Sequence, residues 1–181
     1  MSTFLVVVDA NVLVPAVLCD FILRAAGADM YRLVWTEDIL DEVRRTLIID
    51  LGKSVAQADR RIAAMKSTFP EALITQHTQL IPAMTNDPKD RHVLAAAVAS
   101  GSQVIVTSNI SDFPAESLAP FSIEVQAPDQ FLTNLLDLDY EQVSNILGQQ
   151  ARALRNPPKT VNDLLNDLAR LAPNFVGQLH F

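Results

Sequence analysis

The chain has 181 residues, of which 49% are hydrophobic and 19% are charged, so it can form one compact core with a small appendage rather than a disordered chain. Its glycines are too far apart to build a loop that cradles phosphates, which excludes the common nucleotide-binding folds. The net charge of −7 argues against a protein that binds nucleic acid mainly by neutralising phosphates over a broad surface.

The acidic residues are concentrated in the middle of the chain, because residues 92–151 contain Asp and Glu but no Lys or Arg. Any polyanion would therefore have to meet cations from other segments. The single cysteine, Cys19, excludes an intrachain disulfide and favours a reducing, cytoplasmic compartment. The apolar runs are too short to cross a membrane, so no membrane partner is expected.

The first half of the chain alternates predicted strands and helices. An uninterrupted apolar run over residues 4–8 predicts a strand buried on both faces, and a mostly apolar helix over 11–26 follows it. A short strand over 31–35 leads to a helix capped by Thr36, and a further helix is expected over 56–69.

The segment Asp87-Pro88-Lys89-Asp90 predicts the start of another helix, with Asp87 as the capping residue and Pro88 at the first helical position. The body of this helix, residues 93–99, is apolar nearly all round, which is typical of a helix packed between layers. Gly101 is expected to end it.

Two more short strands, over 104–106 and 123–125, continue the alternation and predict an α/β sandwich with a mainly parallel central sheet. Beyond them only helices are expected, over 129–136 and 139–154 and then in a last helix that is stopped at Pro173. We therefore expect a domain over residues 1–127 and a helical extension over 128–181 that packs on or beside it.

Four acidic residues are candidates for one cluster. Asp9 ends the first strand and Asp112 follows a later one, and the carboxyl ends of parallel strands meet at one edge of the sheet. Asp90 lies on an apolar helix face, and Glu42 flanks the apolar stripe of its helix. Close carboxylates repel unless a cation neutralises them, and oxygen ligands favour Mg²⁺ or Mn²⁺, with one or two ions. Such a site predicts phosphodiester hydrolysis by an activated water.

Each acid also has an ordinary structural interpretation. Asp9 is suited to a turn or a helix cap, and Asp90 and Asp112 are suited to the first turns of helices. Glu42 is a common residue on a solvated helix face. Only the joint placement of the four favours a metal site.

Four segments, in this order, are similar to those of the PIN-domain ribonucleases, and particularly to VapC-type toxins of bacterial toxin–antitoxin pairs. The resemblance covers roughly residues 4–126, and the C-terminal helices resemble those of a toxin subgroup with an extended end. The matching segments are VVDANVL at 7–13, ILDEV at 39–43, NDPKDRHVLAAA at 86–97 and VTSNISDF at 106–113.

The resemblance implies a PIN-like three-layer α/β/α sandwich in which four acidic residues bind Mg²⁺ or Mn²⁺ and cleave RNA. Many relatives carry Thr-x-Asp where this chain has Thr107-Ser108-Asn109, which leaves the number of ions open because Asn109 is a neutral and weaker ligand. The implied metal-binding and catalytic residues are Asp9, Glu42, Asp90 and Asp112, with Asn11, Thr107 and Asn109 as polar support.

The resemblance further implies an endoribonuclease that acts as the toxin of a type II pair, is inhibited by a cognate antitoxin, and forms a homodimer. Arg91, Arg44 and Arg45 lie close in sequence to the acids and are candidate contacts to RNA, or else ordinary surface charges. Arg44 and Arg45 could instead pair with acidic residues of a partner. Two other functions stay open at this point. One is an RNA- or protein-binding module without catalysis, suggested by Asn109, and the other is a DNA-directed structure-specific nuclease.

Overall fold

A computed structural model describes residues 4–179, and its centre is a parallel sheet of four short strands. Their order is β2-β1-β3-β4, so the two central strands are the buried apolar runs expected from the sequence. Val7 of β1 pairs with Val34 on one side and with Ile105 on the other. The strands are β1 (Leu5–Val8), β2 (Arg32–Val34), β3 (Val104–Val106) and β4 (Glu124–Gln126).

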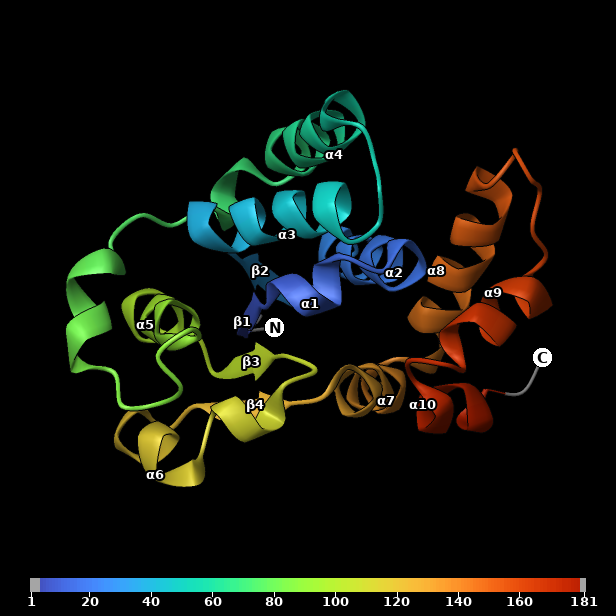
Figure 1. The fold of residues 1–181 in the computed structure, drawn as a ribbon. Coiled ribbons are helices and arrows are strands. Elements are labelled where there is room, and N and C mark those ends of the chain that lie inside the picture. Colours follow the sequence, from blue (N-terminus) through green and yellow to red (C-terminus); the bar gives the residue numbers. More distant parts are fainter. Residues whose placement is uncertain (1–3, 180–181) are drawn as a thin grey trace.

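Helices cover both faces of this sheet, with α5 (Arg91–Ser100) on one side and α2 (Ala16–Gly27) and α7 (Pro128–Leu138) on the other (Figure 1). The residues of α5 from Val93 to Ala97 are fully buried, as its apolar composition predicts. On the opposite face, Phe131 of α7 packs edge-on against Tyr31, with ring centroids 5.2 Å apart. The predicted three-layer α/β/α sandwich is confirmed.

The helix expected over 11–26 is in fact two helices, α1 (Ala10–Leu13) and α2. Between them Pro15 has an extended backbone, with ψ of 119°, and it provides no N–H for a continuing helix. This correction matters for the site, because the break leaves α1 as a short turn directly at the end of β1.

The next helices form an antiparallel hairpin beside the sheet (Figure 1). Thr36 caps α3 (Glu37–Ile49) as predicted, because its hydroxyl accepts the N–H of Ile39 at 3.2 Å. Ser54 caps α4 (Val55–Thr68) in the same way through Gln57. Short 3₁₀ segments then lead to the turn before α5; they are η1 (Pro70–Ala72) and η2 (Thr78–Ala83).

The start of α5 differs from the prediction. Residues 88–90 form a turn, and the helix begins only at Arg91. The Asp87 carboxylate accepts the N–H of Lys89 at 3.0 Å, so it caps this turn instead of the helix. Asp90 occupies the N-cap position without a capping bond from its side chain, which leaves its carboxylate available for other contacts.

Helical segments complete the chain, and Pro173 begins a helix instead of ending one, which corrects the prediction. Proline is favoured at a first helical position because that position needs no N–H donor. Phe175 packs against Phe21 with ring centroids 5.5 Å apart, so the C-terminal helices share one core with the sheet. These segments are η3 (Ile110–Asp112), α6 (Ala115–Leu118), η4 (Ala119–Phe121), α8 (Tyr140–Ala153), α9 (Val161–Leu168) and α10 (Pro173–Gln178).

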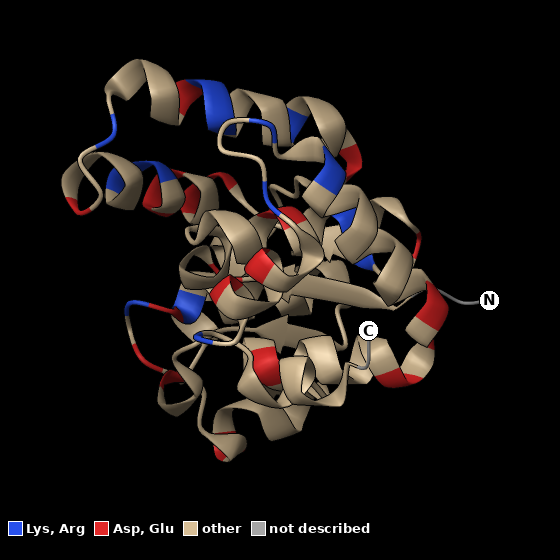
Figure 2. Cartoon of the chain, turned by 90° about the vertical axis from the view of Figure 1, so that its right-hand side faces the viewer, with Lys and Arg blue, Asp and Glu red and all other residues tan. Residues whose placement is uncertain are grey.

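The charges divide between parts of the fold. Lys and Arg lie mainly on the α3–α4 hairpin and toward the C-terminal helices, whereas the region of β3, β4 and α7 has acidic residues alone (Figure 2). Between residues 4 and 179, no helix has both the length and the apolar character needed to cross a membrane.

Gly101 gives a test of this fold, because it ends α5 with φ of +69°, a conformation that strains residues with a Cβ. We expect Gly101→Ala to lower the free energy of unfolding by about 1 kcal/mol. Gly177 in α10 has open space where a Cβ would sit, so Gly177→Ala should leave stability unchanged or raise it slightly. Urea unfolding measures both, and an equal loss in the two variants would contradict this assignment.

Candidate functional site

Asp9 stands where β1 ends, and its carboxylate is anchored by hydrogen bonds on both oxygens. Oδ1 accepts the N–H of Ala10 at 2.7 Å, so Asp9 does cap α1. Oδ2 accepts the Thr107 hydroxyl at 2.7 Å and the Asn11 amide at 2.8 Å. Asp9 is only 2% exposed, and burial raises its pKa although these hydrogen bonds act in the opposite direction. The helix cap and the site acid are therefore the same residue.

Asn11 and Thr107 also fix the loop that follows β3. The side-chain Oδ1 of Asn11 accepts the N–H of Ser108 at 2.9 Å, and the Thr107 hydroxyl accepts the N–H of Asn109 at 3.1 Å. The supporting residues expected from the sequence thus form one hydrogen-bonded group that joins the ends of the two central strands. These bonds fix the start of the loop that runs from Asn109 to Asp112.

Asp90 and Asp112 come together from two different loops. The backbone N–H of Asp87 donates to the carbonyl of Asp112 at 3.1 Å, which ties the turn before α5 to the segment after β3. Partial burial raises the pKa of Asp90 to about 7, and the negative charges of Asp9 and Asp112 and a hydrogen bond with Asp112 add to this shift. Both the burial and the neighbouring negative charges therefore disfavour the ionised form of Asp90.

Glu42 approaches the cluster from α3 and contacts His92 at the start of α5. Glu42 Oε1 lies 3.0 Å from His92 Nε2, in a close ion-pair contact that is not aligned as a hydrogen bond. Burial lowers the pKa of His92, but the Glu42 carboxylate and the more distant Asp38 and Asp9 outweigh it, so the pKa is raised overall. Sequence reasoning missed this pair because its members are far apart along the chain.

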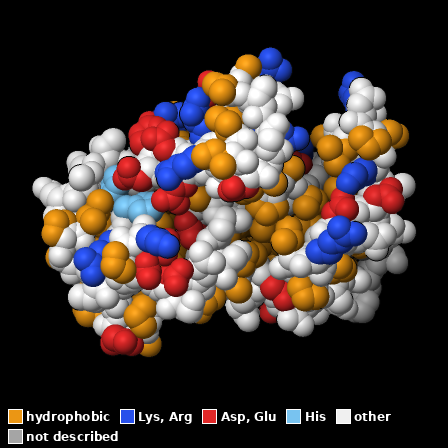
Figure 3. Space-filling view, viewed as in Figure 1, with side chains coloured by type: hydrophobic (Ala, Val, Ile, Leu, Met, Phe, Trp, Pro, Cys, Tyr) orange, Lys and Arg blue, Asp and Glu red, His pale blue; other side chains and the backbone are white. Residues whose placement is uncertain are grey.

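All four acids line one open cavity of about 760 Å³ at the carboxyl end of the sheet. On this face acidic, basic and histidine side chains lie together between α3 and α5 (Figure 3). The cavity lining also includes the predicted supporting residues Asn11 and Asn109 and two cations, Arg45 and Lys89.

Of the three arginines considered as contacts to RNA, Arg44 and Arg91 are engaged elsewhere. Arg44 turns toward α4, where its Nε lies 2.5 Å from Asp59 Oδ1. Arg91 Nε donates to the backbone carbonyl of Asn86 at 3.2 Å and so holds the turn before α5. Neither residue lines the cavity. Two other cations do line it: Arg45, which follows Arg44 in the sequence, and Lys89, which precedes Asp90.

The donor set fits a hard divalent cation in its chemistry, because the cavity offers carboxylate and amide oxygens without cysteine. In this structure, however, the side chains do not surround a single ion position. Within residues 4–179, no three His, Cys, Asp or Glu side chains are arranged so that they could hold one ion. The acids therefore suit Mg²⁺ or Mn²⁺ by ligand type and by excess charge, and their positions would have to adjust on binding.

Comparisons with known proteins match both parts of the chain. A PIN domain model matches residues 5–111, and a model of the VapC50 C-terminal domain matches residues 128–181. A protein of Mycobacterium tuberculosis (strain ATCC 25618 / H37Rv) named "Putative ribonuclease VapC50" is 41% identical over 102 residues. This match covers 56% of the chain and 60% of that protein, which is less than two thirds of its length. No solved structure matches.

The raised pKa of Asp90 predicts how stability depends on pH without metal. The pKa of Asp90 is about 7 in the folded chain, against an ordinary value of 3.8 for an aspartate. Folding is therefore accompanied by the uptake of a proton when the pH lies between these two values. The cost of the ionised carboxylate grows as pH rises through this window and is complete above pH 7. Asp90→Asn removes that cost, so we expect it to stabilise the protein by about 1 kcal/mol at pH 8, a figure reduced for solvent screening.

This stabilisation should shrink as the pH falls toward 5. Urea unfolding in a chelator at pH 5, 6, 7 and 8 measures it, with Asp137→Asn as the control because Asp137 is an exposed carboxylate on α7. A difference between wild type and Asp90→Asn that is the same at pH 5 and pH 8 would contradict the assigned shift.

Proposed function

Because this chain belongs to the PIN-domain family, we propose that it is a metal-dependent endoribonuclease that cleaves RNA phosphodiester bonds. The observation that carries the proposal is the gathering of Asp9, Glu42, Asp90 and Asp112 around one cavity, at the edge where the ends of parallel strands meet. The relative in Mycobacterium tuberculosis bears the name of a ribonuclease, which supports RNA as the substrate.

In this proposal the four carboxylates hold Mg²⁺ or Mn²⁺, as one ion or two, with Asn109 as a neutral donor. When bound, such an ion neutralises the cluster, polarises the phosphate and lowers the pKa of a water nucleophile. Thr107 and Asn11 keep Asp9 in a fixed orientation through their bonds to Oδ2. Asp90, whose pKa is about 7 without a cation, is the residue whose ionisation most needs the positive charge.

Cleavage of RNA tests the proposal directly. Wild type should cut a mixed RNA substrate with Mg²⁺ or Mn²⁺ and fail in EDTA, and Asp90→Asn should reduce the rate by about 100-fold or more. Asp9→Asn should do the same, but Asp9 is buried, so circular dichroism must show that this variant folds. Asp137→Asn is the matched control and should keep full activity.

Three outcomes would overturn the proposed endoribonuclease activity. Equal activity of wild type and Asp90→Asn would exclude the carboxylate cluster as the active site. No cleavage of any RNA by wild type, with binding of RNA retained, would favour a module that binds without catalysis. Cutting of structured DNA in preference to RNA would instead indicate a DNA-directed nuclease.

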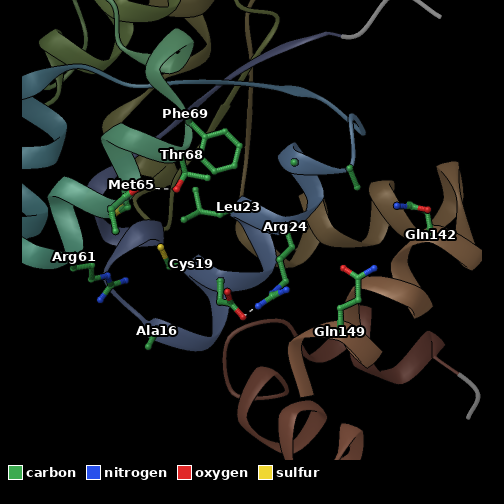
Figure 4. Close-up of a pocket in the computed structure, with 14 residues that line it drawn as sticks. Ala16, Cys19, Leu23, Arg24, Arg61, Met65, Thr68, Phe69, Gln142 and Gln149 are labelled. Atoms are coloured by element: carbon green, nitrogen blue, oxygen red, sulfur yellow. Dashed lines mark hydrogen bonds and ion pairs between the residues drawn. The ribbon is translucent and has the colours of Figure 1, made fainter. Parts of the chain in front are cut away.

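We further propose that the protein is the toxin of a type II toxin–antitoxin pair, and that a helix of the antitoxin lies in a groove away from the active site. A hollow of about 780 Å³ runs between α2 and α4, with α8 of the C-terminal extension as its third wall (Figure 4). Leu23, Met65 and Phe69 give it an apolar lining, and Gln142 and Gln149 reach it from α8. An apolar groove of this kind suits the apolar face of an amphipathic helix.

The oligomeric state and the location in the cell belong to the same proposal. A homodimer is expected from the resemblance to VapC-type toxins, and a cytoplasmic location is consistent with the single, buried Cys19.

Two neighbouring alanines of α4 test the groove. Ala64 lines it and Ala63 does not, and both are exposed. Ala64→Arg should fill the groove and weaken binding of the protein encoded by the adjacent gene by about tenfold or more, a loss of about 1.4 kcal/mol. Ala63→Arg should leave binding unchanged in the same calorimetric titration. Equal effects of the two variants would place the antitoxin elsewhere.

A further inference from the structure

Two basic side chains, Arg45 and Lys89, line the cavity that holds the four carboxylates. Most other cations near the site are already engaged, but these two form no ion pair with any residue in the range 4–179. Both side chains are exposed. They are therefore free cations beside a cluster of negative charge.

The two cations reach the cavity from different elements. Arg45 follows Glu42 by three residues on α3, and this spacing places both side chains on one face of the helix. Lys89 lies in the turn before α5, and Asp87 fixes that turn by accepting the N–H of Lys89 at 3.0 Å through its side chain and the N–H of Asp90 at 2.9 Å through its carbonyl. A ligand in the cavity would thus meet a cation on each of two walls.

Their sequence neighbours show why the positions are distinct. Arg44 follows Glu42 by only two residues, so it faces away from the cavity and pairs with Asp59 on α4. Arg91 donates a hydrogen bond to the backbone carbonyl of Asn86. Arg45 and Lys89 form no ion pair in the described chain, so both are available to a ligand that enters the cavity.

Every phosphate of an RNA strand is negatively charged. A strand that enters this cavity therefore meets repulsion from the four carboxylates, in a protein whose net charge is −7. Cations placed at the site itself are needed to offset this repulsion, since the surface as a whole does not attract a polyanion. We propose that Arg45 and Lys89 bind the RNA phosphates that flank the bond to be cut. This rests on the proposed endoribonuclease function and adds the residues that bind its substrate.

The test measures binding of a fluorescently labelled single-stranded RNA by anisotropy, with Mg²⁺ present and Asp90→Asn as the parent so that the RNA stays intact. Arg45→Ala and Lys89→Ala should each weaken binding by about 3- to 10-fold. Each should also reduce the slope of log K against log salt concentration by about 0.7, the value for one phosphate contact with a single strand. The controls are Arg44→Ala, next to Arg45, and Lys53→Ala, an exposed lysine outside the cavity.

A second measurement uses the active enzyme. With the native Asp90, the Arg45→Ala and Lys89→Ala variants should raise KM for RNA cleavage and leave kcat within about twofold, because the cations bind the substrate strand and do not touch the reacting atoms.

The outcomes separate this inference from the function on which it rests. If the parent binds RNA and the two cavity variants match the Arg44→Ala and Lys53→Ala controls in affinity and salt slope, the phosphate contacts are wrong and the nuclease stands. If the variants lose antitoxin binding but keep RNA binding, the cations serve a protein partner and the inference is overturned. If the parent binds no RNA and wild type cleaves none, the proposed function and the inference fall together.

Discussion

The hydrogen bond from the Thr107 hydroxyl to Asp9 Oδ2, 2.7 Å long, joins the ends of the two central strands, and the site depends on it. A carboxylate that is 2% exposed is costly unless its oxygens are bonded, and the bonds from Ala10, Asn11 and Thr107 meet that need. The parallel pairing of β1 with β3 brings these donors to one point. Asp9 is therefore held by the central sheet itself, and the other acids reach it from α3, from the turn before α5 and from the segment after β3.

The other acids are held less tightly, and this difference matters for the chemistry. Asp90 occupies an N-cap position without a capping bond, and among the described residues Glu42 forms an ion pair with His92 alone. Side chains with few bonds can move to ligate a cation, whereas Asp9 provides a fixed reference. Burial raises the pKa of Asp90 to about 7, and the negative charges of Asp9 and Asp112 add to this shift, so a bound cation would favour its ionised form. The acidic residues of the site thus account for part of the net negative charge of the protein. In this proposal a polyanion is bound by a few cations inside the cavity.

The sequence was sufficient where local patterns decide the outcome. Buried apolar runs located β1 and β3, and Thr36 gave the start of α3, because strand burial and capping depend on neighbouring residues. It failed where tertiary contacts choose between local alternatives. Pro15 and Pro173 each allow a helix to stop or to start, and the local pattern does not choose between the two. The spacing from Glu42 separates Arg45 from Arg44, but only the fold shows that Glu42 faces the cavity and that Asp59 of α4 lies opposite Arg44.

The central claim is that the four carboxylates bind a divalent cation, and calorimetric titration of the metal-free protein with Mn²⁺ at pH 7 tests it most directly. We expect Mn²⁺ to bind to wild type and to bind at least about tenfold more weakly to Asp90→Asn. Binding to wild type should release protons, since Asp90 must ionise to ligate the ion, and this release should be absent in Asp90→Asn. Unchanged affinity in Asp90→Asn, or no binding of Mn²⁺ to wild type, would contradict it.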